Sequence, residues 1–174
     1  MNYATIKNCD IANGLGIRVS LFVSGCTHHC KGCFNSIAWP FDYGEVFTKE
    51  IEEQILEECS KTYIAGLTLL GGEPFEPSNQ IGLIHLLREF KKRFPNKNIW
   101  AYTGYVLETE ILPKNGKVHN EVTDEMLSYI DVLVDGRFVE ELKDISLKYR
   151  GSSNQRLIDL KKTLSENKIV LFEF

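Results

Sequence analysis

Hydrophobic residues recur along the chain with two alternating periods, which predicts a sheet interleaved with helices. Short runs of β-branched and large apolar residues predict strands, and they occupy 17–23, 67–70, 98–102, 131–134 and 168–172. Apolar residues three or four positions apart predict helices, and they occupy 48–59, 78–93, 123–129 and 157–164. The polar stretch 112–120, which contains a proline and a glycine, predicts a loop.

This order of elements is typical of α/β proteins with a mostly parallel sheet. We expect one domain over residues 1–174, because that length suits a single hydrophobic core. In such folds the loops after the strands gather at one end of the sheet and form the site. Four distinctive loops follow predicted strands and should meet there, at 26–33, 71–74, 103–104 and 135–138.

Charge and composition narrow the class of partner. The formal net charge is −4 and 43% of residues are hydrophobic. A mildly acidic chain disfavours nucleic-acid binding, which usually needs a basic face. The N-terminus lacks the apolar run of a signal peptide, and no stretch has the length that spans a bilayer. We therefore expect a cytoplasmic protein that binds neither nucleic acid nor membrane.

Three of the five cysteines form the motif C-x3-C-x2-C at Cys26, Cys30 and Cys33. Without a secretion signal, metal ligation explains this spacing better than a disulfide framework. A four-iron cluster takes thiolate ligands, and one loop can supply three of them. The fourth iron is then left open to a substrate. The motif therefore predicts a catalytic iron–sulfur centre on these three residues.

A zinc site with His28, His29 or another residue as the fourth ligand is the alternative. Structural zinc motifs usually come as paired cysteine knuckles, and the chain has no second pair. We expect both histidines to be solvent-facing or hydrogen-bonded loop residues. Cys9 and Cys59 are expected to be ordinary small apolar residues.

A second motif, Gly71-Gly72-Glu73-Pro74, follows the next predicted strand. Glycines at a strand end permit a close backbone approach. Backbone carbonyls or the Glu73 carboxylate are therefore candidates to accept hydrogen bonds from a ligand ammonium group, and a plain tight turn is the alternative. The glycines of 13–16 precede a strand, so they lack the context of a dinucleotide-binding loop.

Together the two motifs resemble the radical S-adenosylmethionine (SAM) superfamily. Further segments resemble the activating proteins of anaerobic ribonucleotide reductases, and the likeness runs from about Tyr3 to Arg156. Those segments are Asp10–Arg18, Ser24–Cys26, Cys33–Asn35, Val134–Phe138 and Arg150–Arg156. An activase of another glycyl-radical enzyme is the competing hypothesis.

The resemblance implies an incomplete (β/α) barrel that holds a [4Fe-4S] cluster on Cys26, Cys30 and Cys33. It implies reductive cleavage of SAM to a 5′-deoxyadenosyl radical, which generates a glycyl radical on the large subunit of the reductase. A flavodoxin or a ferredoxin-like protein is the expected electron donor. Most of this chemistry belongs to the cofactors, while the protein supplies orientation and exclusion of water.

The resemblance also indicates which residues are candidates to contact the cofactor. Gly32 stands where the superfamily often has an aromatic residue, so Phe34 is the candidate adenine contact. Asp135 is a candidate for a ribose hydroxyl, with a turn-forming role as the alternative. Arg150–Arg156 is a polar cluster suited to a carboxylate, or else a solvated loop. The other cofactor-binding candidates are Gly71, Gly72, Glu73, Arg150 and Asn154. Arg18 has either a site role or a plain surface role.

Overall fold

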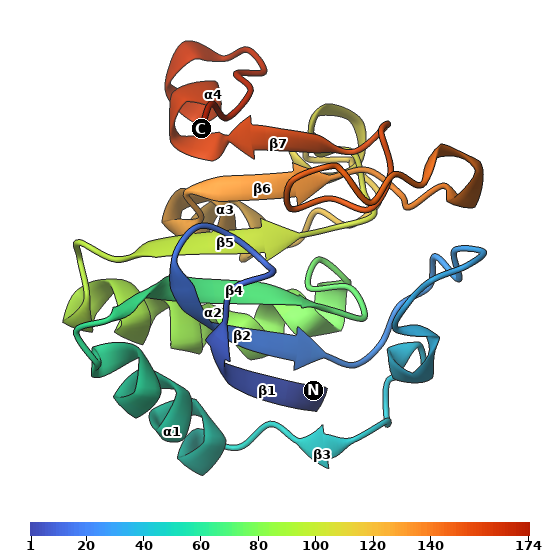
Figure 1. The fold of residues 1–174 in the computed structure, drawn as a ribbon. Helices are drawn as coiled ribbons and strands as arrows, with labels where there is room; N and C mark the ends of the chain where they lie inside the picture. The colour runs from blue at the N-terminus through green and yellow to red at the C-terminus, as the bar shows by residue number, and fades with distance from the viewer.

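The computed structural model describes residues 1–174 and contains one seven-stranded sheet (Figure 1). The strand order is β3-β1-β2-β4-β5-β6-β7. The strands are β1 (Asn2–Asp10), β2 (Ile17–Val23), β3 (Glu45–Val46), β4 (Ile64–Gly71), β5 (Asn98–Tyr102), β6 (Val132–Asp135) and β7 (Arg156–Asp159). The central four, β2, β4, β5 and β6, are parallel, and antiparallel strands flank them on both sides. The α/β prediction is confirmed, and the open sheet is consistent with a partial barrel.

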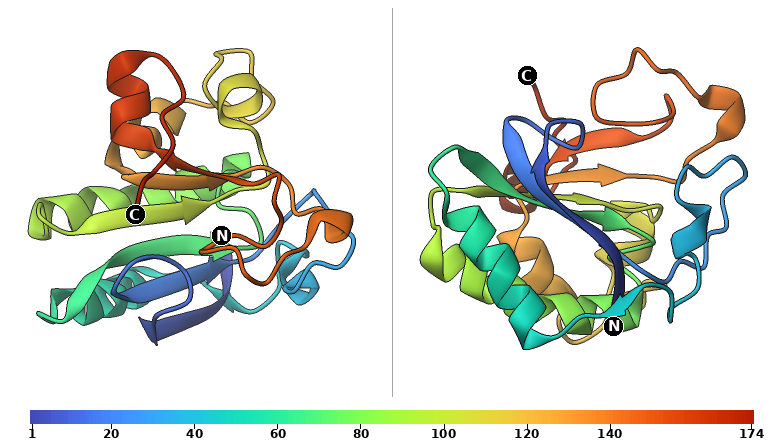
Figure 2. Two further views of the ribbon diagram at one scale, coloured as in Figure 1. Left: turned by 45° about the horizontal axis from the view of Figure 1, so that its top comes forward. Right: turned by 60° about the horizontal axis from the view of Figure 1, so that its bottom comes forward.

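Helices α1, α2 and α3 pack along one face of this sheet (Figure 2). The helices are α1 (Lys49–Ser60), α2 (Pro77–Arg93), α3 (Thr123–Tyr129) and α4 (Leu160–Glu166), with short turns η1 (Ser36–Ala38), η2 (Leu107–Ile111) and η3 (Glu140–Leu142). Thr48 caps α1 by accepting a hydrogen bond from the Ile51 N–H. None of the helices has the length and apolarity needed to cross a membrane.

Alternation along the strands divides the interior into two parts. Val19 and Leu21 of β2 face the helices and belong to a core of 28 buried residues. Residues of the opposite face include Trp100 and Val134, which form a smaller cluster with Val132 and Leu157. The apolar residues of the central strands therefore pack on both faces of the sheet, as expected for a sheet that is covered on both faces.

Arg18 lies on this second face and is fully buried, so the prediction of a surface arginine is wrong. Its guanidinium donates to Thr68 Oγ1 (2.6 Å), Asn98 Oδ1 (2.7 Å) and the carbonyl of Leu67 (2.8 Å). The Trp100 ring lies 5.6 Å from the guanidinium carbon. Burial lowers the pKa of Arg18 to about 10. Arg18 thus joins β2 to β4 and β5.

The C-terminal prediction is wrong in two places. Residues 157–159 belong to β7 instead of a helix, because Leu157 and Ile158 pair with β6 and are buried. Asp159 then caps α4 by accepting from the Lys162 N–H at 3.0 Å. The predicted strand 168–172 is reduced to one bridge between Leu171 and Ile158.

The N-terminal strand was not predicted from the hydrophobic pattern. β1 is interrupted by two irregularities in its pairing with β2, and much of it is solvent-exposed at the sheet margin. These features break the alternation on which strand prediction depends. β1 and β2 form a hairpin, pairing antiparallel with Asp10 opposite Arg18.

Candidate functional site

The four loops that follow the parallel strands meet around one cavity of about 410 Å³. All three motif cysteines line it, as do Gly71–Glu73, Thr103–Gly104, and Gly136 with Phe138. In Figure 1 the loops after β2 and β6 project from the same end of the sheet. The structure therefore confirms that these loops converge.

Strand register places the two sequence motifs side by side. Val23 at the end of β2 pairs with Gly71 at the end of β4. Beyond that pair, the Glu73 N–H donates to the Gly25 carbonyl at 2.8 Å. A Cβ on Gly72 would lie only 2.5 Å from that same oxygen. The glycines are needed because the Gly-Gly-Glu loop runs against the backbone of the cysteine loop.

The cysteine loop presents three free thiols, and one of the sulfurs accepts a backbone hydrogen bond. The Asn35 N–H donates to the Cys33 sulfur at 3.4 Å. Hydrogen bonds to sulfur are a feature of iron–sulfur sites and tune their potential.

The protonation of these thiols depends on whether metal is bound. Burial raises the pKa of Cys26 to about 12 and also raises the pKa of Cys30. Iron binding must therefore release protons from the loop. Three thiols without a fourth cysteine in the lining fit a cluster that keeps one open iron.

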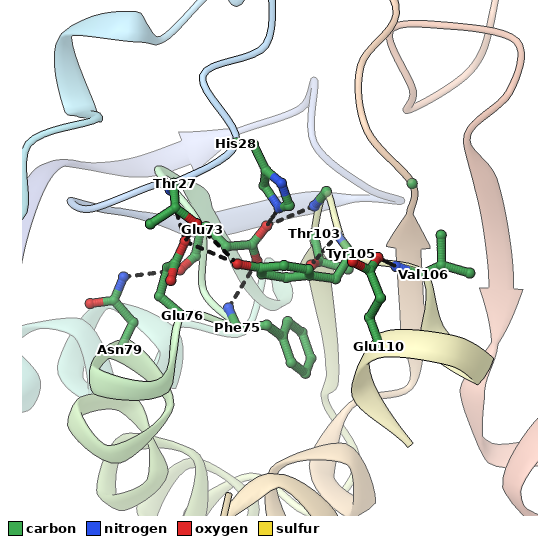
Figure 3. Close-up of polar contacts among 12 residues, drawn as sticks. Thr27, His28, Glu73, Phe75, Glu76, Asn79, Thr103, Tyr105, Val106 and Glu110 are labelled. Atoms are coloured by element: carbon green, nitrogen blue, oxygen red, sulfur yellow. Dashed lines mark hydrogen bonds and ion pairs between the residues drawn. The ribbon is translucent and has the colours of Figure 1, made fainter. Parts of the chain in front are cut away.

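Glu73 is buried, and both of its carboxylate oxygens are hydrogen-bonded (Figure 3). Oε1 accepts from the Phe75 N–H at 2.9 Å. Oε2 accepts from the Gly104 N–H at 2.7 Å and lies 3.0 Å from His28 Nε2. The carboxylate thus connects the cysteine loop, its own loop and the loop after β5.

The two histidines of the motif differ in environment. His28 is buried in the cavity wall and hydrogen-bonded to Glu73, so of the two predicted alternatives it is the hydrogen-bonded one. His29 is exposed and stacks on Trp39, with ring centroids 4.6 Å apart. Cys59 lies in the core as predicted, whereas Cys9 is exposed.

Glu76 is a site-supporting residue that the sequence reasoning missed. Its carboxylate accepts from the Thr27 N–H (2.8 Å), the Thr27 hydroxyl (2.6 Å) and the Tyr105 hydroxyl (3.2 Å), as drawn in Figure 3. Thr27 directly follows the first cysteine of the motif, so Glu76 fixes the start of the cysteine loop. No local pattern signals this role, because the two residues are 49 positions apart.

Asp135 lies outside the cavity lining and borders an adjacent polar depression. Its carboxylate accepts from the Leu107 N–H at 3.0 Å and from Arg156 Nε at 2.9 Å. Arg156 also donates two hydrogen bonds to the Glu108 carboxylate. The carboxylates of Glu108 and Asp135 together raise the pKa of Arg156. The structure therefore separates Asp135 from the three cysteines, and its role toward a ribose stays a prediction.

Residues of the polar segment 150–156 line both the cavity and the adjacent polar depression. Arg150 lines the cavity and donates to the Gln155 carbonyl at 2.6 Å. Asn154 borders the depression and donates to the Arg137 carbonyl at 2.8 Å. Phe34 lines the cavity but is 83% exposed, so its contact with adenine also stays a prediction.

Comparison with known proteins agrees with this geometry. A family model described as a 4Fe-4S single cluster domain matches residues 12–158. The anaerobic ribonucleoside-triphosphate reductase-activating protein of Haemophilus influenzae is 45% identical over 89% of this chain and 96% of its own length. The proteins of the same name from Escherichia coli K12 and phage T4 are each 43% identical, over 89% and 90% of this chain and 96% and 93% of their own lengths. The chain therefore belongs to the family of anaerobic ribonucleoside-triphosphate reductase-activating proteins, which are radical SAM enzymes with a 4Fe-4S cluster.

Proposed function

We propose that this chain activates an anaerobic ribonucleoside-triphosphate reductase by generating a glycyl radical on the large subunit of that enzyme. The supporting observation is that the three cysteines and the Gly-Gly-Glu loop line one cavity. When bound, the cluster supplies the electron that cleaves SAM to methionine and a 5′-deoxyadenosyl radical. The radical removes a hydrogen atom from the partner's glycine.

We assign the two cofactors to different parts of the cavity wall. Cys26, Cys30 and Cys33 hold the cluster, and SAM occupies the space beside Gly71, Gly72 and Glu73. The volume of about 410 Å³ lies within the range of small-molecule sites. The lining contains two cationic side chains, Lys143 and Arg150, and the planar guanidinium of Arg150 suits the SAM carboxylate better.

The partner completes the enclosure of the site. Phe34 and Ile145 line the cavity and are 83% and 95% exposed, so its rim is apolar and open. A carbon radical reacts only with an atom that it touches, so the partner's glycine must enter here. Binding of the glycine segment would cover the exposed rim and exclude water from the radical.

The electron comes from outside the chain. Beyond the motif, only Cys9 and Cys59 remain, one exposed on β1 and the other in the core, so they do not form a second cluster site. A flavodoxin or a ferredoxin-like protein fits the need for a single low-potential electron. We place the reaction in the cytoplasm, where such carriers and ribonucleoside triphosphates are found.

Electron paramagnetic resonance (EPR) of the reconstituted, reduced protein tests the proposed cofactor arrangement. We expect a reduced four-iron signal that changes when SAM is added, because SAM binds at the open iron. A cluster that does not respond to SAM, or a protein that takes up zinc in place of iron, would contradict the proposal. Formation of 5′-deoxyadenosine without a radical on the reductase would instead indicate a different partner.

A further inference from the structure

The cavity extends beyond the cysteines onto the second face of the sheet. Its lining there includes Tyr102, the last residue of β5, and Ala12 and Asn13 from the connection between β1 and β2. Tyr102 packs against the cluster around Trp100, so its ring lies on that face. In Figure 1 the connection passes in front of β4 and β5. Asn13 and Tyr102 form what we call the inner wall, which is separate from the loops at the strand ends.

The Tyr102 hydroxyl is buried and has no hydrogen-bond partner within the chain. Buried polar atoms in proteins nearly always have partners, so this hydroxyl points to a missing ligand group. Burial raises the pKa of Tyr102, so the hydroxyl keeps its proton at neutral pH. A protonated hydroxyl is a hydrogen-bond donor, and a carbonyl oxygen is an acceptor that suits it.

Asn13 supplies an acceptor on the same wall. Its side-chain nitrogen donates to Asp10 Oδ2 at 2.7 Å. A carboxylate only accepts hydrogen bonds, so this contact turns the amide nitrogen toward Asp10 and leaves Oδ1 free to accept. The Asn13 carbonyl accepts from the Thr68 hydroxyl at 2.9 Å, and Thr68 pairs with Trp100 of β5. Asn13 is therefore tied to the sheet beside the strand that carries Tyr102.

A donor and an acceptor in one wall match the polar groups of a peptide backbone. Glycine has no side chain, so a protein recognises it through its backbone N–H and C=O groups. The radical removes a hydrogen atom from the glycine α-carbon, so that carbon must touch the 5′ carbon of SAM inside the cavity. Thr103 and Gly104 directly follow Tyr102 and also line the cavity, and the Gly104 N–H donates to Glu73. The inner wall therefore lies next to the space that we assign to SAM.

The other polar side chains of the lining are largely engaged. Glu73 accepts three hydrogen bonds, Arg150 donates to a backbone carbonyl, and Gln155 bonds to three backbone groups. Two lining residues have a buried side-chain atom without a partner, His28 and Tyr102. His28 belongs to the cysteine loop, whereas Tyr102 stands on the inner wall. The Tyr102 hydroxyl is therefore the group that is positioned for the partner's segment.

We propose that the Tyr102 hydroxyl donates a hydrogen bond to the carbonyl oxygen of the partner's glycine. This inference rests on the proposed function, because it takes the glycine segment of the reductase as the ligand. In the reaction, the glycine Cα–H bond breaks evenly, the hydrogen atom forms a new C–H bond at the 5′ carbon, and the unpaired electron stays on the glycine. Tyr102 keeps its proton throughout. Its hydrogen bond turns the α-carbon toward the radical and stabilises the electron density that the product radical shares with its carbonyl.

Tyr102→Phe removes the hydroxyl and keeps the ring. Because the hydroxyl has no partner in the chain, the variant should load iron and sulfide normally and unfold at the wild-type temperature or above it. Tyr63→Phe is the matched control, since Tyr63 is 52% exposed and precedes β4, at the opposite end of that strand from the Gly-Gly-Glu loop. Loss of the fold or of the cluster in Tyr102→Phe would show that the hydroxyl bonds within the chain and would overturn the proposal.

Two readouts separate the glycine from SAM as the ligand of the hydroxyl. One is the SAM dissociation constant, from EPR titration of the reduced cluster, and the other is the glycyl radical formed on the reductase per 5′-deoxyadenosine. In Tyr102→Phe we expect SAM binding within about twofold of wild type and a radical yield about 3- to 10-fold lower, the loss typical of one neutral hydrogen bond. Tyr63→Phe should match wild type in both. Weaker SAM binding would assign the hydroxyl to SAM, and an unchanged yield would leave it without a role toward the glycine; either result overturns the proposal.

The same experiment distinguishes a failure of this inference from a failure of the proposed function. If wild-type protein with a loaded, reduced cluster forms no radical on the anaerobic reductase of the same organism, the proposed function fails and this inference fails with it. If wild type forms the radical and Tyr102→Phe forms as much per 5′-deoxyadenosine, only the role of Tyr102 fails.

Discussion

At the scale of single residues, two buried charged side chains of opposite sign are satisfied in different ways. Glu73 is an anion satisfied by two backbone N–H groups and an imidazole. Arg18 is a cation satisfied by hydroxyl, amide and carbonyl oxygens, without a carboxylate within ion-pair distance. Each is stable only while its partners stay in place, because an unpaired buried charge is very costly.

Serine substitution tests the cluster ligands one at a time. Cys33→Ser should abolish stable [4Fe-4S] loading, because a hydroxyl is a poor replacement for a thiolate ligand. Cys9→Ser is the matched control, since Cys9 is exposed on β1 and away from the motif. Iron and sulfide analysis after anaerobic reconstitution gives the result. Full loading of Cys33→Ser, or loss of the cluster in Cys9→Ser, would disprove the ligand assignment.

Arg18→Met should destabilise the fold by about 2–4 kcal/mol, because Asn98 Oδ1 and Thr68 Oγ1 would lose their buried donor. Arg88→Met provides the comparison, since Arg88 makes an exposed pair with Glu125 that contributes at most about 1 kcal/mol. Urea denaturation of the two apo-proteins measures both effects. A smaller loss for Arg18 than for Arg88 would refute the structural role.

At the scale of elements, prediction succeeded where the signal is local. The helix from Thr48 has a cap and acidic residues in its first turn, and β2 and β5 are rich in β-branched and large apolar residues. β7 was missed because four residues are too few for a period, and its identity comes from pairing with β6. Sequence reasoning found the cysteines and the Gly-Gly-Glu loop through local spacing. It missed Glu76 and the burial of His28, which depend on contacts between distant segments.

The loop after β5 offers a test of how tightly the site is packed. In Gly104→Ala, the new methyl group would lie 2.5 Å from His28 Cδ2 and push the imidazole away from Glu73. We expect a stability loss of about 1–3 kcal/mol and weaker SAM binding. In the control Gly151→Ala, the nearest atom is 3.1 Å away, on the Phe138 ring. Equal effects of the two substitutions on SAM affinity would contradict this packing argument.

The ion pair between Glu108 of η2 and Arg156 of β7 predicts that the stability of the fold depends on pH. The hydrogen bond from Arg156 lowers the pKa of Glu108 below its ordinary value of 4.5. The pair therefore contributes stability at neutral pH and loses that contribution as the pH falls through the lowered pKa. The contact is partly exposed, so its contribution is about 0.2–1 kcal/mol.

Denaturant titrations of wild type and Glu108→Gln at several pH values test the predicted direction in which stability changes with pH. Wild type should be more stable at pH 7, and the difference should shrink below about pH 4. A difference that grows on acidification would mean that the carboxylate is not held in its charged form. Asp144→Asn provides a control for surface charge, since its carboxylate bonds only within its own turn at Ser146.

At the scale of the whole molecule, the parallel strands bring four loops of the site to one end of the sheet. The cysteine loop and the loop after β6 meet across the cavity, where Lys31 Nζ lies 3.0 Å from Glu140 Oε2. The exposed Phe34 and Ile145 remain at the rim. The fold therefore gathers the cysteine loop and the Gly-Gly-Glu loop around one cavity with an exposed apolar rim.

Because the reductase is proposed to cover the cavity, its binding should change how SAM cleavage is coupled to radical transfer. SAM cleavage should become faster, or more tightly linked to radical transfer, when the reductase is bound, because the covered cavity excludes water. The measurement is the rate of 5′-deoxyadenosine formation with and without the reductase under reducing, anaerobic conditions. An unchanged rate and unchanged coupling would show that the chain completes its site alone.

The most direct test of the central claim is EPR detection of a glycyl radical on the reductase. Reconstituted protein, SAM, a one-electron reductant and the anaerobic reductase of the same organism are combined without oxygen. We predict a glycyl radical signal on the reductase that requires SAM and is absent with Cys33→Ser. If a fully loaded, reduced cluster leaves the reductase without a radical, this chain is not its activating enzyme.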